Sequence, residues 1–219
     1  MAGLTGSQVA TRVKRQFGDE AGAQITDAII LDWINDAQNE IVAKNSELYQ
    51  QKSTANTTVG TAAYGLPALA TDIIRFKRVF YRGQIVDPIS IEQAEEIYPE
   101  KDTLPRPTGA PRHYWIYAET LTFEPAPDAT GALLTIYWQK YPTALTVIGD
   151  AVTLPQRYHL KVVDYCIAKA AELDDDDERH ATKMAMFEAG ISEMNADSWK
   201  PNDDVYPFPT VSSEDQFYG

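Results

Sequence analysis

The chain has a single cysteine, Cys166, among its 219 residues. One cysteine excludes an intramolecular disulfide and a zinc site built from cysteine ligands. Cys166 lies among apolar residues of a predicted helix, which favours a small core side chain. The competing interpretation is a nucleophilic thiol.

The sequence also lacks a long hydrophobic run near its start. The first residues, MAGLTGSQVATRVKRQF, carry basic side chains with no apolar segment behind them. Neither a signal peptide nor a membrane span is predicted there. We therefore expect a protein that is made in a cytoplasm and does not act at a membrane.

Basic residues are scarce, since 19 Lys and Arg stand against 32 Asp and Glu and the net charge is −13. A protein that grips nucleic acid needs a surplus of Lys and Arg to displace the counterions of phosphates. Tight DNA binding is therefore not predicted. An acidic wall could instead repel phosphates and let a duplex slide past, although solubility alone is the simpler explanation of the charge.

Catalytic motifs are missing as well. His113, His159 and His180 fall in three different predicted elements, and the sequence has no HExxH, GxSxG, Walker loop or dinucleotide-binding glycines. The aspartates at 174–177 lack the alternating ligands and the glycine of a calcium loop. No enzyme activity, cofactor or metal site is predicted.

Helical periodicity is present in the first fifty residues. Val9, Val13 and Phe17 share one face of a short helix that ends at Gly18. A longer helix is predicted from the N-cap Thr26. Its apolar face consists of Ile30, Trp33, Ile34, Ala37, Ile41 and Leu48. Its polar face, which meets water or a partner, consists of Asp32, Asn35, Asp36, Asn39 and Glu40.

Two more helices are predicted after residue 150. Leu154-Pro155 opens the first, with Pro155 in its first turn. The aspartate run then separates it from the second, because acidic residues are favoured at a helix N-terminus. The inward positions of the two helices are Tyr158, Val162, Val163, Cys166, Ile167, Ala170 and Leu173, followed by Met184, Phe187, Ile191 and Met194.

The residues between these helices follow the period of two that is typical of antiparallel strands. Arg82-Gly83 is predicted to be a hairpin turn, and Ser90 with Gln93 has the spacing of a capping box on a short helix. The segment KDTLPRPTGAP is expected to be irregular. The tryptophans Trp33, Trp115 and Trp138 are expected in the core, the alternative being an interface.

These patterns predict an α+β fold. The N- and C-terminal helices form a four-helix bundle, and an antiparallel β-sandwich or barrel-like domain is inserted between them. The predicted units are the N-terminal helices at 1–52, the β domain at 53–150, the C-terminal helices at 151–196 and an extended tail at 197–219.

The tail is rich in aromatic residues, whereas disordered tails are normally poor in them. We therefore expect the tail to dock onto another chain, the alternative being that it packs on its own domain. Its aromatic residues are Trp199, Tyr206, Phe208, Phe217 and Tyr218.

An ordered series of short motifs runs from about residue 5 to residue 195: WINDAQNEI, YGLP, IIRFKRV, GAPRHY, LTFEPAP, IYWQKYP, and LP before a long helix. The series resembles the head-to-tail adaptor proteins of tailed bacteriophages, also called connector or head completion proteins. The resemblance implies a helical bundle with a β insertion and a ring of twelve copies below the portal, through which the genome passes. It also implies a C-terminal segment that reaches the portal, and a virion protein whose other neighbour is a tail, stopper or nozzle protein.

In such a ring the aromatic tail residues become candidates for portal docking. The candidates for contacts between copies are Arg12, Lys14, Arg15, Asp32, Asp36 and Glu40. Two alternatives stay open. One is a tail or baseplate component of the virion. The other is a carbohydrate- or receptor-binding module, which would require an exposed stacking platform made of Trp115, Tyr117, Trp138 and Tyr141.

Overall fold

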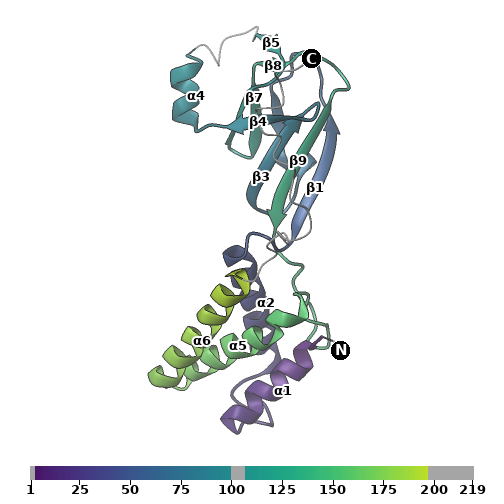
Figure 1. Cartoon of the computed structure of the whole chain (residues 1–219). Helices are drawn as coiled ribbons and strands as arrows, with labels where there is room; N and C mark the ends of the chain where they lie inside the picture. Colours follow the sequence, from purple (N-terminus) through teal and green to yellow (C-terminus); the bar gives the residue numbers. More distant parts are fainter. Residues whose placement is uncertain (1–2, 100–106, 197–219) are drawn as a thin grey trace, which may run out of the picture.

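The computed structural model describes residues 3–99 and 107–196. A sheet forms one end of the molecule, and the helices from the two ends of the chain form the other (Figure 1). The predicted α+β class is confirmed. Strand β1 already begins at Gln50, and the segment after β9 returns to the helical core through Leu145 and Val152. The predicted domain boundaries at 52/53 and 150/151 stay predictions.

Local capping signals set the ends of the N-terminal helices. In α1 (Gly6–Phe17) Thr5 and Gln8 form a capping box, and Gly18 ends the helix with a left-handed φ of 67°. In α2 (Asp27–Lys44) the Thr26 side chain accepts the N–H of Ile29. The predicted end of the first helix at Gly18 and the predicted N-cap of the second at Thr26 are confirmed. Leu48 is buried but lies beyond the end of α2, so its assignment to the helical stripe was wrong.

The C-terminal helices are α5 (His159–Leu173) and α6 (Asp177–Ala196). A 3₁₀ turn at Gln156–Tyr158 precedes α5, so Pro155 caps this turn and does not lie in the first turn of α5 as predicted. The Asp176 carboxylate accepts the Arg179 N–H at 3.0 Å near the start of α6. The predicted role of the aspartate run as a helix boundary is confirmed.

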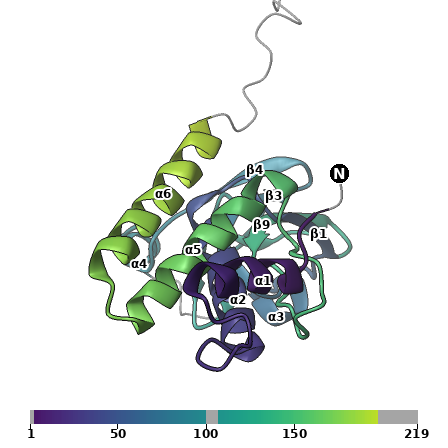
Figure 2. The ribbon, with the colours of Figure 1, turned by 90° about the horizontal axis from the view of Figure 1, so that it is seen from below.

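One apolar core joins the four long helices, and α5 contacts each of the other three. Figure 2 shows α5 between α1 and α6. A shared core is what the predicted bundle requires, although the contacts centre on α5 and are not distributed evenly around four helices. Cys166 is fully buried in this core, and burial raises the pKa of its thiol, which confirms the core interpretation.

The sheet has seven strands in the order β1-β9-β3-β4-β6-β7-β2. Their bounds are Gln50–Asn56 (β1), Ala63–Gly65 (β2), Ile73–Tyr81 (β3), Gln84–Pro88 (β4), His113–Tyr117 (β6), Thr120–Glu124 (β7) and Leu133–Lys140 (β9). A separate parallel pair is formed by Thr108–Gly109 (β5) and Ala126–Pro127 (β8). Two short helices, Leu66–Leu69 (α3) and Ile91–Ile97 (α4), lie between strands.

The sheet curls into a half-barrel around a second core. Val79 and Leu134 come from one end of the strand order and Leu121 and Phe123 from the other, yet they belong to the same buried cluster. A single curled sheet therefore replaces the predicted sandwich, and the barrel-like alternative is the closer description.

Three details of the sheet differ from the prediction. Strands β4 and β6 pair in parallel, with Asp87 opposite His113, because α4 and the segment after it carry the chain back to the same end of the sheet. The segment predicted to be irregular contributes Thr108-Gly109 to β5, and its residues 101–106 lie outside the described part. In β6, Tyr114 and Trp115 are both buried, because α4 packs on this strand and covers its second face.

The other local predictions in the sheet are confirmed. Arg82 and Gly83 have φ values of 48° and 79°, as a two-residue hairpin turn requires, and Ser90 with Gln93 forms a capping box on α4. Trp115 and Trp138 are buried in the sheet part. Trp33 is partly buried and packs against the helical core.

Candidate assembly surfaces and the junction between helices and sheet

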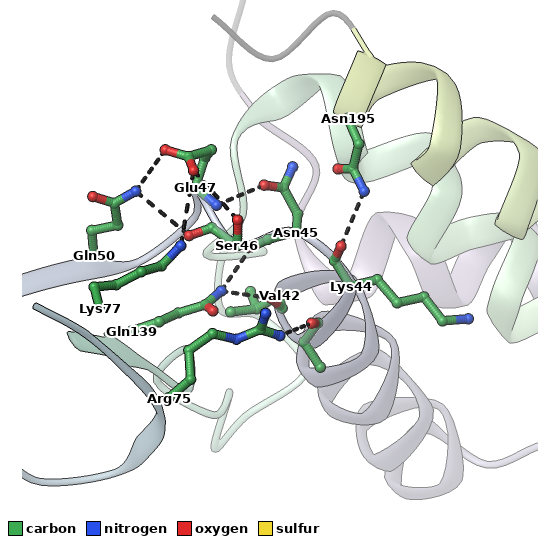
Figure 3. Close-up of polar contacts among 11 residues, drawn as sticks. Val42, Lys44, Asn45, Ser46, Glu47, Gln50, Arg75, Lys77, Gln139 and Asn195 are labelled. Atoms are coloured by element: carbon green, nitrogen blue, oxygen red, sulfur yellow. Dashed lines mark hydrogen bonds and ion pairs between the residues drawn. The ribbon is translucent and has the colours of Figure 1, made fainter. Parts of the chain in front are cut away.

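The C-terminus of α2 is the point where the helical and sheet parts meet. The last carbonyls of any helix lack intrahelical partners and carry partial negative charge. Here four consecutive carbonyls, those of residues 42 to 45, accept hydrogen bonds from side chains of other segments (Figure 3). We call this set of contacts the junction.

The donors at the junction come from three different elements. Gln139 on β9 donates through Nε2 to the carbonyls of Val42 and Asn45, both at 2.7 Å. Arg75 on β3 donates to the Ala43 carbonyl at 2.6 Å. Asn195 on α6 donates to the Lys44 carbonyl at 3.0 Å.

The hydrogen bonds of Gln139 at the junction are shielded from water. Gln139 is fully buried, so water cannot replace its hydrogen bonds to the helix. Asn45 also donates to the Tyr158 hydroxyl at 2.6 Å, which links the junction to the helical core. An ion pair between Lys77 and Glu47, at 3.9 Å, lies alongside. The two parts of the molecule are therefore held in one relative orientation.

No role was predicted from the sequence for Gln139 or Arg75. Both lie in the motif series, Gln139 in IYWQKYP and Arg75 in IIRFKRV. The sequence carried no signal for Gln139, because the period of two places it on the strand face opposite to Trp138, where a polar side chain is ordinary. Gln139 is buried only because the end of a helix nearly a hundred residues earlier in the chain covers it.

The predicted basic contact residues lie on α1. Arg12 and Arg15 are exposed, whereas Lys14 is half-buried and forms a 2.6 Å ion pair with Asp27 of its own chain. The adjoining loop is held by Asp19, whose carboxylate accepts three backbone N–H groups at 2.8–2.9 Å. These hydrogen bonds lower the pKa of Asp19. Arg12 and Arg15 are thus the cations of this surface that remain available to a partner.

The predicted acidic contact residues form a stripe on α2. Asp32, Asp36 and Glu40 are spaced by four residues and therefore share one helix face. Asp32 and Asp36 are exposed, and Glu40 pairs with Lys44 of the same helix at 2.9 Å. Asp36 and Glu40 line a hollow of about 300 Å³ together with Tyr141 and Tyr165.

The three histidines have separate structural contacts. His159 accepts the Leu4 N–H through Nδ1 at 2.7 Å, so its Nε2 carries the proton that bonds the Leu154 carbonyl. His113 pairs with the Tyr98 hydroxyl, and His180 contacts the Ala168 carbonyl. Within residues 3–99 and 107–196, no group of His, Cys, Asp and Glu is arranged to hold a metal ion.

The stacking platform of the carbohydrate-binding alternative is incomplete. Tyr117 and Tyr141 are exposed, but Trp115 and Trp138 are buried in the sheet part. Two of its four aromatic residues are therefore unavailable to a ligand.

The five aromatic residues of the tail, proposed for portal docking, lie outside the described part of the chain. The last described helix, α6, contacts the junction near its end, since Asn195 bonds the Lys44 carbonyl. Among the helices of the described residues, none has the length and apolar character needed to cross a bilayer.

Comparison with known proteins identifies the family. No curated protein matches the chain. A sequence model of the family described as SU10 adaptor protein matches residues 4–210, a span that includes the helices, the sheet and the junction. The chain therefore belongs to the SU10 adaptor protein family, as its resemblance to phage head-to-tail adaptors implied.

Proposed function

We propose that this chain is the subunit of a ring that joins the portal of a tailed phage to its tail and forms part of the channel for the genome. The observation that carries the proposal is the junction, which holds a helical end and a sheet end in a fixed relative orientation. A subunit placed between two different neighbours needs two unlike ends, and this chain has them (Figure 1). Membership of an adaptor family supports the same role.

Opposite charges on two helices support contacts between copies. Arg12 and Arg15 on α1 and the acidic stripe on α2 offer complementary surfaces for a heterologous contact, which closes into a ring when the rotation between subunits is suitable. By the resemblance to adaptors, the ring has twelve copies. A structural role of this kind requires no catalysis, cofactor or metal.

Assembly is the first test. The isolated chain is expected to be a monomer or a weak oligomer that forms a ring only on the portal, because the exposed ion pairs proposed between copies are individually weak. Mass photometry of the chain with and without the portal protein of the same phage measures this. A stable closed dimer of the isolated chain over a wide concentration range would contradict the proposal.

The second test is whether the chain binds DNA, because a channel that lets the genome pass should not hold it. We expect no measurable binding to duplex DNA near physiological salt, where non-specific binders have dissociation constants of roughly 1–100 μM. The reason is the charge, since 32 acidic residues outnumber 19 basic ones. A submicromolar, salt-sensitive shift of plain duplex in an electrophoretic assay would rule out a channel that does not hold DNA.

A further inference from the structure

The outward surface of strands β1, β9, β3 and β4 is an open patch of apolar and basic side chains, which we call the outer face. Its members are Lys52, Arg78, Phe80, Ile85, Leu133 and Tyr137. The register shows that they share a side of the sheet. Lys52 and Arg78 both lie opposite Tyr137, and Phe80 lies opposite Ile85, while the alternate residues Val79 and Ile136 point into the core.

The outer face is organised and accessible. Phe80 and Tyr137 form an edge-to-face pair with ring centroids 5.7 Å apart, and the Lys52 ammonium lies 5.6 Å from the Tyr137 ring. Ile85 and Leu133 are 55% and 50% exposed. Arg78 is exposed and has no hydrogen-bond or ion-pair partner among the residues that the structure describes.

Lys52 and Arg78 lie on either side of Tyr137, and Phe80, Ile85 and Leu133 lie next to this row. In a chain of net charge −13, such a surface fits a partner that is acidic and apolar. Helix α4 carries such a surface. Ala94 is buried against the sheet part, whereas Glu92, Glu96 and Ile97 are exposed, with Ile97 at 51%. Glu92 and Glu96 are four residues apart and therefore lie on one face of the helix.

Helix α4 lies away from β1 and β9, the strands that carry Lys52, Leu133 and Tyr137. Both views place α4 on one side of the molecule and β1, with β9 next to it, toward the other (Figures 1 and 2). Copies arranged side by side with their long directions alike would bring α4 of one copy to the sheet part of the next. A contact between unlike surfaces of this kind is heterologous and can close into a ring.

We propose that the outer face binds helix α4 of a second copy of this chain, with Lys52 and Arg78 facing Glu92 and Glu96 and with Ile97 packing near Ile85. This inference rests on the proposed ring and adds a contact at the level of the sheet to the one proposed between α1 and α2.

Reciprocal charge reversal tests the contact. One variant carries Lys52→Glu and Arg78→Glu, and the other carries Glu92→Lys and Glu96→Lys. Each variant alone sets like charges against each other, so its self-association at high concentration and its cooperative loading onto portal rings should weaken roughly tenfold or more. An equimolar mixture restores opposite charges at every contact and should assemble as the wild type does. The double variant Glu178→Lys with Glu193→Lys makes the same charge change on α6 and should behave as the wild type.

Cysteine cross-linking gives an independent measurement. Cys166 is fully buried, so the wild-type chain offers a low background. With a short bismaleimide, a chain carrying both Ile85→Cys and Ile97→Cys should form a ladder of cross-linked oligomers on portal rings, and either single variant should not.

The inference is overturned if both charge variants fold and assemble as the wild type does, if the mixture stays unassembled, or if the double-cysteine chain forms no ladder on a loaded portal. These outcomes leave the proposed function intact when the wild-type chain still loads onto the portal. Failure of the wild-type chain to load onto the portal would instead contradict the proposed function. The contact between the outer face and α4 would then still be tested by sedimentation of the charge variants and of their mixture at high concentration.

Discussion

Deletion of residues 197–219 is expected to abolish stable attachment of the chain to the portal ring while leaving the described part folded, with little change in Tm. The tail follows α6 in the sequence, and α6 contacts the junction through Asn195 near its end. Burial of one large apolar side chain stabilises a complex by about 1.5–3 kcal/mol, so several aromatic residues together can anchor an extended segment. Pro201, Pro207 and Pro209 restrict the free tail and reduce the entropy lost on docking.

A triple substitution, Trp199→Ala with Tyr206→Ala and Phe208→Ala, should reproduce most of this loss of attachment. The matched control is Ser212→Ala with Ser213→Ala, which changes the same segment without removing an aromatic ring. Portal binding is measured by mass photometry and folding by thermal unfolding. A truncated chain that unfolds at a much lower temperature, while its folded fraction still binds the portal, would show that the tail is part of the subunit's own core.

Substitution of Gln139 is expected to destabilise the whole molecule. Gln139→Ala removes two hydrogen bonds, each worth about 0.5–1.5 kcal/mol, and leaves a cavity in a fully buried site, while the N–H groups of Asn45 and Leu48 still reach the two carbonyls at 3.3 Å. The free energy of unfolding should therefore fall by roughly 2–4 kcal/mol in chemical denaturation. Gln51→Ala is the control, because Gln51 lies on the adjacent strand and its side chain bonds only a carbonyl of its own strand among the contacts of the described residues.

Gln139→Glu tests the hydrogen bonds of the side chain alone, because glutamate has nearly the same shape and volume as glutamine. A carboxylate at this position would face two carbonyl oxygens in a buried site. The pKa of the introduced carboxyl group should therefore be higher in the folded protein than in the unfolded chain. The destabilisation should then grow as the pH rises above about 4.3, the ordinary pKa of glutamate, and shrink below it. A Gln139→Glu chain as stable as the wild type at pH 7 would contradict the role assigned to the junction.

Features encoded by neighbouring residues were predictable from the sequence. Thr5, Thr26 and Ser90 cap their helices through hydrogen bonds to residues three positions later, and Arg82-Gly83 supplies the positive φ values that its hairpin needs. Each of these signals involves residues close in the sequence, so it does not depend on how the distant parts of the chain are arranged.

Features that depend on distant segments were not predictable. The parallel pairing of β4 with β6 follows from where the chain returns after α4, and the burial of Trp115 follows from the helix that covers its strand. Lys14 looked like a free cation until the fold brought Asp27 to it. The roles of Gln139 and Arg75 exist only because β9 ends and β3 begins at the C-terminus of α2.

A cryo-electron microscopy reconstruction of the virion's portal vertex would show whether this chain forms a ring between portal and tail. We expect a closed ring of copies of this chain in contact with the portal, with the helical part and the sheet part at different heights along the channel. Copies found only in the distal tail or baseplate, or no copies at the portal vertex, would contradict it.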